Sequence, residues 1–388
     1  MTAPTSLQAG SEPPRPADRR PGLVARWRAL RDRLLASPDF RRRALAFAPT
    51  RWIARRRAAA LFDLVAGFVY SQVLYACVRL GVFDLLAAAP LPASEVALRT
   101  DLPLASAVRL LDAAVALHLL ERRGAAGYGL GRLGAALVDN ASVAAMIEHH
   151  AALYADLRDP VALLRGQLGE LAGYWPYAVE KAPATLAPRQ VAGYSALMAA
   201  SQPLVADEIL DAYDLRRHRC LLDVGGGEGG FLASAGRRHG ELRLMLFDLP
   251  AVTRRAAGRF EAAGLTGRTT LHGGDFLRDA LPRGADVISL VRVVHDQDDA
   301  GMRRLLAAAH EALPPGGVLL LGEPMAATPG SPAMGDAYFG IYLLAMGRGR
   351  PRSAAELTQA LVEAGFIAVR QWPTHMPLQT GLLSATRA

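Results

Sequence analysis

The stretch LLDVGGGEGGF at residues 221–231 decides the fold of the larger part of the chain. Its apolar start is typical of a buried strand, and Gly225, Gly227 and Gly230 fit the pattern G-x-G-x-x-G that leads from a strand into a helix. Glycines at such a turn let the backbone bend tightly and approach a ligand closely. Dinucleotide-binding enzymes share this pattern, so it predicts a ligand at a strand end without choosing the ligand.

Short apolar runs alternate with helical stretches from residue 218 to the end of the chain. This alternation is typical of a doubly wound α/β domain with a mostly parallel sheet. Seven strands are expected, so the sequence predicts a Rossmann-like domain. Their sequences are CLLDV, LRLMLFD, TTLHG, DVISLVRVV, GVLLLGE, IAVRQW and LLSATR.

Polar residues follow these predicted strands. Asp248 ends the second one, where an acid binds the ribose hydroxyls of NAD or S-adenosylmethionine equally well. Asp275 and Phe276 follow the third strand; Asp275 is expected either beside an adenine or as a turn residue. His295 follows the fourth strand and is expected to act as a general base, because the unperturbed pKa of histidine lies near neutral pH. A surface histidine is the alternative reading of the position.

Within residues 58–140, the stretch 61–86 predicts one long helix and a shorter one, broken near Gly81. A helix, a turn, a second helix and a short Gly-bounded hairpin are predicted after it, which is a winged-helix arrangement. Winged helices often bind DNA. The helix expected to enter the groove, residues 105–119, carries Arg109 as its single cation and is otherwise apolar. It is therefore expected to contact a partner chain, not nucleic acid. The uncharged run 64–78 predicts a buried core helix in preference to a membrane span.

The chain has 388 residues and a formal net charge of +8. The positive charge is concentrated at the start, because residues 1–57 contain 14 arginines and four acids. Residues 1–21 are rich in proline, and a helix follows in which Leu23, Trp27 and Leu30 alternate with arginines. Such a helix can lie on an anionic membrane surface; packing on the next domain is the alternative. The two cysteines, Cys77 and Cys220, predict neither a disulfide framework nor a zinc site.

The order of Asp-x-Gly-x-Gly, FDLP, GGDF, HD and PPGGVLLLGEP resembles the S-adenosylmethionine-dependent O-methyltransferases of small molecules that carry an N-terminal winged-helix dimerisation domain. The resemblance covers about residues 58–386. It implies S-adenosylmethionine as cofactor, a homodimer, and four segments: a Pro-rich start with a basic arm (1–57), a dimerisation domain (58–140), a helical connector (141–215) and a methyltransferase domain (216–388). A transcription regulator is disfavoured by residues 105–119, and an NAD-dependent oxidoreductase by the absence of a Tyr-x-x-x-Lys motif.

The resemblance also implies roles for individual residues. His295 takes the proton of the acceptor hydroxyl and Glu323 orients it, whereas Pro351 stands where relatives have a second orienting glutamate. Residues expected to bind the cofactor are Tyr194, Met198, Asp223, Gly225, Gly227, Asp248, Leu249, Gly274, Asp275, Phe276 and Arg292. Residues expected to form an apolar, aromatic wall for the acceptor are Tyr338, Phe339, Tyr342 and Met346.

The segments 54–81, 149–160 and 174–178 look like one branch of the family, the hydroxycarotenoid O-methyltransferases of purple photosynthetic bacteria. This branch implies methyl transfer to the tertiary 1-hydroxyl of an acyclic hydroxycarotenoid of the demethylspheroidene or hydroxyneurosporene type. The bacteriochlorophyllide C-20 methyltransferase and other small-molecule O-methyltransferases are the alternatives. A cytoplasmic protein with peripheral membrane contact through residues 22–57 is expected. No metal is implied: the adjacent His149 and His150 are expected on opposite sides of a helix, in a structural role or at an acceptor entrance.

Overall fold

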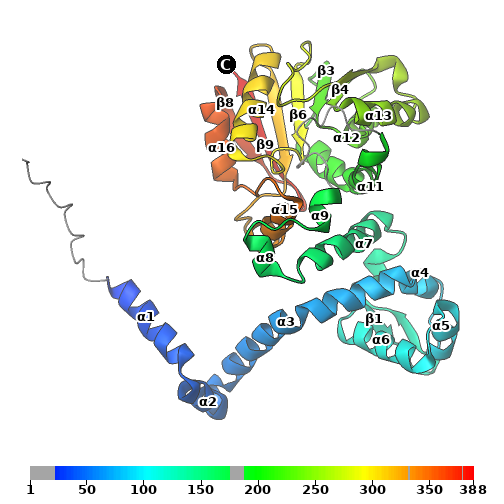
Figure 1. Cartoon of the computed structure of the whole chain (residues 1–388), viewed down its shortest axis with the longest axis vertical. Coiled ribbons are helices and arrows are strands. Elements are labelled where there is room, and N and C mark those ends of the chain that lie inside the picture. Colours follow the sequence, from blue (N-terminus) through cyan, green and yellow to red (C-terminus); the bar gives the residue numbers. More distant parts are fainter. Residues whose placement is uncertain (1–21, 175–187, 331–332, 378) are drawn as a thin grey trace, which may run out of the picture. The chain divides into compact units, whose positions relative to one another are not determined.

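The computed structural model describes residues 22–174, 188–330, 333–377 and 379–388; at residue 174 and over residues 188–200, Met198 excepted, it describes the backbone alone. The chain divides into two compact units, one ending at Val73 and the other beginning at Leu74 (Figure 1). The domain limits expected from the sequence stay predictions.

The first unit contains α1 (Leu23–Ala36), α2 (Pro38–Ala46) and most of α3 (Ala48–Arg79). The arm is broken between α1 and α2 because Pro38 begins a new helix and the Ser37 hydroxyl accepts a hydrogen bond from the N–H of Phe40. No residue of α1 or α2 is buried. Helix α3 runs without interruption through residues 57 and 58.

The expectation that residues 64–78 form a buried core helix is wrong for this chain. In α3 only Cys77 is buried, and Leu64 and Phe68 are 82% and 72% exposed. Apolar side chains surround much of this helix, and an apolar run gives the same sequence signal whether or not other residues pack on it. Among the described residues α3 alone has the length and hydropathy of a membrane span, a test that core helices of water-soluble proteins also pass.

Residues 74–140 have the predicted helices and hairpin. Gly81 has a φ of 63° and separates α3 from α4, as the sequence predicted. The short strands β1 and β2 pair antiparallel, and Leu91 forms a further bridge to Tyr128 of β2. The elements are α4 (Val82–Ala87), α5 (Ala93–Thr100), α6 (Leu104–Ala116), β1 (Leu120–Arg122) and β2 (Tyr128–Leu130).

The predicted seven-stranded sheet is confirmed, with the order β5-β4-β3-β6-β7-β9-β8. β9 is the one antiparallel strand, since it pairs antiparallel with both β7 and β8. The central strands β3 and β6 are buried at every residue, as expected for parallel strands covered on both faces. The strands are β3 (Cys220–Val224), β4 (Arg243–Asp248), β5 (Thr269–Gly273), β6 (Val287–Val291), β7 (Val318–Glu323), β8 (Phe366–Trp372) and β9 (Gly381–Arg387).

Helices cover both faces of this sheet (Figure 1). Leu222 of β3 faces α14 (Asp299–Ala312) and α16 (Ala354–Glu363), whereas the next residue back, Leu221, faces the opposite helices. These are α11 (Pro188–Ala212), α12 (Gly230–Arg238) and α13 (Pro250–Ala262). Other described helices are α7 (Ala141–Asp156), α8 (Pro160–Leu164), α9 (Glu170–Tyr174), the π-helix η5 (Ala333–Phe339) and α15 (Gly340–Met346).

Candidate active site

The predicted site residues lie at the carboxyl edge of the sheet. β3 leads into the glycine loop, β4 ends at Asp248, β6 leads to His295 and β7 ends at Glu323. The chain connections change direction between the neighbouring strands β3 and β6, and open α/β sheets bind ligands at such a point. The topology therefore gathers residues that are far apart in the sequence.

The glycine loop is held against the sheet through Gly225. Its φ is 68°, and its N–H donates a hydrogen bond of 2.8 Å to the carbonyl of Phe247. A Cβ at this position would lie 2.8 Å from Cγ2 of Val293, so a larger residue would push the loop away from the end of β6. At Gly227, whose φ is 60°, the same side is open. The loop therefore packs against the protein at Gly225, whereas at Gly227 there is free space next to the backbone.

Asp248, at the end of the neighbouring strand β4, binds the glycine loop through its side chain. Its carboxylate accepts hydrogen bonds from the N–H of Gly227 at 2.8 Å and from the N–H of Leu249 at 2.7 Å. Burial raises the pKa of Asp248 to about 6, although both amides favour the charged form. The structure therefore brings together three of the predicted cofactor-binding residues.

Asp223 lies fully buried beneath the same loop. One carboxylate oxygen accepts a hydrogen bond of 2.6 Å from the hydroxyl of Ser289. Within the described part of the chain the other oxygen, Oδ2, has no partner, and a Cβ on Gly226 would approach it to 2.2 Å. Burial, with a smaller contribution from the charge of Asp248, raises the pKa of Asp223 to about 7. An unpaired buried carboxylate oxygen favours a hydrogen-bond donor at this loop.

The segment after β5 reaches the same region. The N–H of Gly274 donates to the carbonyl of Asp248 at 2.9 Å. Asp275 is buried and acts as a turn residue, because its Oδ1 accepts a hydrogen bond from the N–H of Leu277. Phe276 packs beside Gly225. Asp275 therefore has the turn geometry that was its alternative interpretation, and its role toward a cofactor stays a prediction.

Arg292 joins the end of β6 to α11. Its guanidinium donates to the hydroxyl of Ser201 at 2.8 Å and contacts the sulfur of Met198. The backbone of Arg292 is left-handed, with a φ of 58°, and its N–H donates to the carbonyl of Gly322. Such a conformation is uncommon outside glycine and is typical of functional sites. The side chain of Tyr194 lies outside the described residues.

His295 and Glu323 form a hydrogen-bonded pair in the protein interior. Nδ1 of His295 contacts Oε2 of Glu323, and Oε1 of Glu323 accepts hydrogen bonds from the N–H groups of Val293 and Val294 at 3.0 and 2.7 Å. One carboxylate thus fixes both the histidine ring and the backbone that leads to it. The contact between the two residues is established, and their catalytic roles stay predictions.

Asp296 was not singled out by the sequence analysis, although it follows His295 directly. Its Oδ1 lies 3.1 Å from Nε2 of His295. Burial lowers the pKa of His295, but the negative charges of Asp296 and Glu323 outweigh it and raise the value to about 10. This differs from the expected ordinary pKa near neutrality, because the sequence did not show that carboxylates flank both ring nitrogens.

The segment 347–353 packs its backbone against residues 293–297, the loop that carries His295 and that we call the histidine loop. The N–H of Arg350 donates to the carbonyl of His295 at 2.9 Å, and Gly349, with a φ of 85°, lies so close that a Cβ would be 2.2 Å from the same oxygen. The buried Arg352 donates to the carbonyls of Val294 and Gln297 at 3.0 and 2.8 Å. The sequence showed here only the loss of a glutamate at position 351, and it gave no signal for this role of Arg352.

The predicted aromatic wall is assembled by η5 and α15. Tyr338 stacks on Tyr342 with 5.8 Å between ring centroids, and the ring of Phe339 lies 6.3 Å from that of His295. Met346 is buried in the adjoining apolar cluster with Tyr342. Burial raises the pKa of Tyr338 to about 12, against the opposing charge of nearby Arg292. The rings of this wall therefore lie beside His295, close to the end of β6.

The expected orientation of His149 and His150 is wrong. Nε2 of His149 lies 2.9 Å from the hydroxyl of Tyr342, and Nε2 of His150 lies 2.7 Å from that of Tyr338. Consecutive residues on a helix differ by only about 100° in direction, so His149 and His150 do not point to opposite sides. Their rings contact Tyr342 and Tyr338, which are four positions apart in the chain. Burial, with the charge of His150, lowers the pKa of His149 to about 4. Both histidines belong to the wall, and no cluster among the described residues has the ligands for a metal ion.

Comparisons with known proteins agree with this geometry. The chain matches the O-methyltransferase domain family over residues 154–367 and the O-methyltransferase dimerisation domain family over residues 62–140. Demethylspheroidene O-methyltransferase of Cereibacter sphaeroides is 45% identical over 338 residues, which cover 87% of this chain and 89% of that protein. The protein of the same name from Rhodobacter capsulatus is 44% identical over 340 residues, with coverages of 86% and 84%. The structure of human N-acetylserotonin methyltransferase in complex with SAM has a TM-score of 0.71 at 25% identity, covering 86% of this chain and 98% of that one.

Proposed function

The chain belongs to the O-methyltransferase family in which a dimerisation domain precedes the catalytic domain, and from this we propose that it methylates a hydroxylated carotenoid. It is an S-adenosylmethionine-dependent O-methyltransferase. The proposal for the acceptor is carried by one observation: two demethylspheroidene O-methyltransferases are similar to the chain over most of its length. The acceptor group that we propose is the tertiary 1-hydroxyl of an acyclic hydroxycarotenoid.

The residues at the carboxyl edge of the sheet fit the cofactor, which supplies an electrophilic methyl group on a sulfonium when it is bound. The carboxylate of Asp248 suits a ribose, since it can accept hydrogen bonds from two hydroxyls. The open side of Gly227 leaves room for a close approach to the backbone, and the unpaired oxygen of Asp223 lies under the same loop. Residues that we propose to hold the cofactor are Tyr194, Met198, Asp223, Gly225, Gly227, Asp248, Leu249, Gly274, Asp275, Phe276 and Arg292.

The aromatic wall supports an apolar acceptor. Tyr338 and Tyr342 direct their hydroxyls to His150 and His149, so the polar atoms of both tyrosines already have partners. The rings of Tyr338 and Phe339 are left as apolar surface beside the catalytic pair, and ligand pockets for hydrophobic molecules are lined in this way. We propose that Tyr338, Phe339, Tyr342 and Met346 contact the polyene chain.

Positioning supplies most of the catalysis in this proposal. A tertiary alcohol is much less acidic than a phenol, so its full deprotonation before the attack is not expected. The rigid hold of Glu323 on His295 and on the amides of Val293 and Val294 fixes the group that handles the proton. Alignment of reacting atoms in a fixed site can lower a barrier by several kcal/mol, on the order of 7–11 in the best cases.

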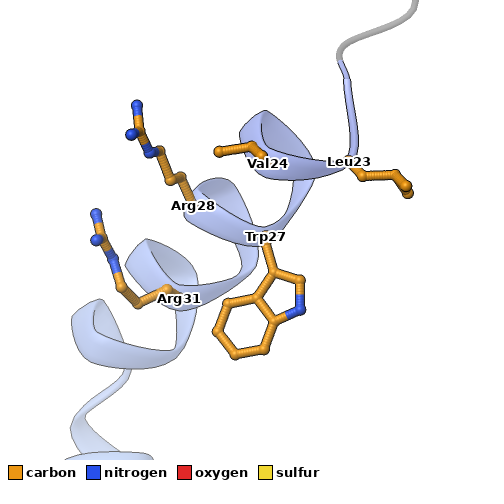
Figure 2. Close-up of a pocket in the computed structure, with 5 residues that line it drawn as sticks. All are labelled: Leu23, Val24, Trp27, Arg28 and Arg31. Carbon is orange, nitrogen blue, oxygen red and sulfur yellow. The ribbon is translucent and has the colours of Figure 1, made fainter.

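A peripheral attachment to the photosynthetic membrane, on its cytoplasmic side, belongs to the proposal. The dimerisation domain supports a homodimer, and the arm of residues 22–57 suits a lipid surface. In α1 the side chains of Leu23, Val24, Trp27, Arg28 and Arg31 line a shallow hollow. Figure 2 shows Arg28 and Arg31 extending to one side of the helix while Trp27 projects from the other. An apolar strip flanked by cations is typical of helices that lie in the interface of an anionic bilayer.

The test uses the full chain with methyl-labelled S-adenosylmethionine and, in separate reactions, a 1-hydroxycarotenoid or a bacteriochlorophyllide. Label in an ether of the carotenoid is the expected result. Label in the bacteriochlorophyllide only would replace the acceptor and keep the cofactor. Label in neither pigment would contradict the proposed acceptor and its rival together.

A further inference from the structure

Two histidines of α7 hold the hydroxyl ends of the two tyrosines in the aromatic wall. Nε2 of His150 lies 2.7 Å from the hydroxyl of Tyr338, and Nε2 of His149 lies 2.9 Å from that of Tyr342. Each imidazole also meets its tyrosine ring at a steep angle, with 5.6 and 5.9 Å between the ring centroids. The partners are 188 and 193 residues apart in the sequence, so these contacts join α7 to η5 and α15.

These polar atoms lie in apolar surroundings. Tyr342 is buried in a cluster that contains leucines of α7, α8, α9 and α15, and Tyr338 packs on the same cluster. Burial lowers the pKa of His150, and burial together with the charge of His150 lowers the pKa of His149 to about 4. Both imidazoles are therefore neutral at pH 7, so they bond the tyrosine hydroxyls without placing a charge beside the wall.

Tyr338 lies close to the residues at the carboxyl edge of the sheet. Its ring centroid is 5.0 Å from that of Phe339, which in turn is 6.3 Å from that of His295. The positive charge of Arg292, next to the end of β6, acts to lower the pKa of Tyr338 against the larger effect of burial. Tyr338 is thus two ring contacts away from His295, and the direction of its hydroxyl affects the polarity of the space beside that histidine.

The backbone of η5 is held from a different side. A Cβ at Gly335 would lie 2.4 Å from the carbonyl oxygen of Met325, and Oδ2 of Asp336 accepts a hydrogen bond of 3.0 Å from the N–H of Ala327. These contacts fix the π-helix to the segment after β7 but involve no tyrosine side chain. Because π-helical turns are frequent at functional sites, the separate hold on the side chains from α7 points to a role in the site.

A tyrosine hydroxyl that loses its histidine would change the wall. A buried polar group without a partner is costly, so the hydroxyl would turn toward another partner or bind water. Either change would make the wall polar, and an apolar chain could then bind only by displacing water or by leaving the hydroxyl unpaired. Removing the hydroxyl together with the imidazole would avoid this cost, because neither partner is then left alone.

We propose that His149 and His150 are positioning residues for acceptor binding, which keep the wall apolar by bonding the hydroxyls of Tyr342 and Tyr338. The proposal rests on the proposed methylation of a hydroxycarotenoid and names two residues of α7 that favour such an acceptor. In this role neither histidine takes part in the methyl transfer. They support the binding of an acceptor whose chain next to the reacting hydroxyl is apolar.

The test is the steady-state methylation of the 1-hydroxycarotenoid by the full chain and its variants. His150→Leu leaves Tyr338 without this partner at nearly unchanged volume. We expect the KM for the carotenoid to rise at least fivefold, while kcat and the affinity for S-adenosylhomocysteine change less than twofold, because binding is affected and the transfer is not. In the double variant His150→Leu with Tyr338→Phe we expect KM to return to within twofold of the unaltered protein. His149→Leu, alone and with Tyr342→Phe, should behave in the same way.

The matched control is a second histidine–tyrosine pair. Nε2 of His218 lies 3.1 Å from the hydroxyl of Tyr213, and the pair precedes β3, at the edge of the sheet opposite to the site. His218→Leu should lower the melting temperature and leave the KM for the carotenoid within twofold.

Three results would overturn the proposal and keep the proposed function: an unchanged KM in His150→Leu, no recovery in the double variant, or an equal rise of KM in His218→Leu. Absence of methylation by the unaltered protein is a different result, because it would overturn the proposed acceptor and, with it, this role of the two histidines.

Discussion

At the scale of single residues, the proposed role of Asp248 in binding the cofactor predicts that this binding depends on pH. Burial raises its pKa to about 6 in the free protein, and only the ionised carboxylate accepts hydrogen bonds from both ribose hydroxyls. Below pH 6 the carboxyl group must lose a proton before it can bind, so we expect affinity to fall as pH falls, by about tenfold between pH 7 and 5. Calorimetric titration with S-adenosylhomocysteine at several pH values measures this.

The control for this prediction is Asp248→Asn, which has no titrating group at that position. We expect it to bind weakly at every pH and to lose the dependence on pH near 6. Asp223, whose pKa is raised to about 7, titrates in an adjacent range. A variant at Asp248 that keeps the full pH dependence would assign the effect to Asp223 instead.

Arg352 is the residue whose loss we expect to destabilise the active-site loop most. It is 2% exposed and donates to the carbonyls of Val294 and Gln297. Arg352→Leu leaves both buried carbonyls without this donor, and each unsatisfied group lowers the free energy of unfolding by about 1–3 kcal/mol. Urea denaturation should therefore show a free energy of unfolding lower by about 2–5 kcal/mol.

The matched control is Arg350→Leu, two positions away. The side chain of Arg350 is 46% exposed and its ion pairs lie at the surface, where such pairs contribute about 0–1 kcal/mol. Equal losses in the two variants would contradict the role given to the buried guanidinium.

At the scale of elements, the segment between α15 and α16 presses its backbone on the histidine loop. Gly349→Ala places a Cβ against the carbonyl of His295, whereas Gly166, with a similar φ of 87°, has nothing within 4 Å. Both substitutions strain a left-handed residue by about 1–2 kcal/mol, but only the first displaces His295 and Asp296. We expect Gly349→Ala to reduce the methylation rate at least tenfold and Gly166→Ala to leave it nearly unchanged, as measured in parallel with thermal stability. Similar rates in the two variants would mean that the close approach does not position the loop.

The elements that the sequence predicted are those whose pattern is local. The strand CLLDV is apolar throughout because β3 is covered on both faces, and the acids and glycines at strand ends mark the ligand edge of the sheet. The contacts of Arg352 with the carbonyls of Val294 and Gln297 depend instead on two segments that meet only in the fold. The orientation of His149 and His150 depends likewise on where η5 places Tyr338 and Tyr342. The exposure of α3 could not be predicted from the sequence pattern either, because an apolar helix has the same pattern whether or not other residues pack on it.

At the scale of the whole molecule, charge is divided between a strongly basic arm and a nearly neutral remainder. Residues 22–57 contain eleven arginines and two aspartates. A second copy of the arm is an unfavourable partner, because like charges repel. Nucleic acid would attract the arginines but would leave Leu23 and Trp27, 81% and 73% exposed, in water. An anionic lipid surface would attract the arginines and would also bury the apolar strip at the level of the acyl chains.

We therefore expect the full chain to float with anionic vesicles and not with neutral ones, and to be released largely by 0.5 M salt, since each arginine near the surface contributes about 1 kcal/mol that salt screens. Replacing Leu23, Trp27 and Leu30 by serine should weaken binding at least tenfold, because the apolar strip no longer enters the interface while every charge remains. The control replaces Leu98, Leu104 and Leu133, which are exposed outside the arm. If both triple variants float equally, the strip is not the anchor; if the chain binds duplex DNA but no vesicle, the arginines have a different partner.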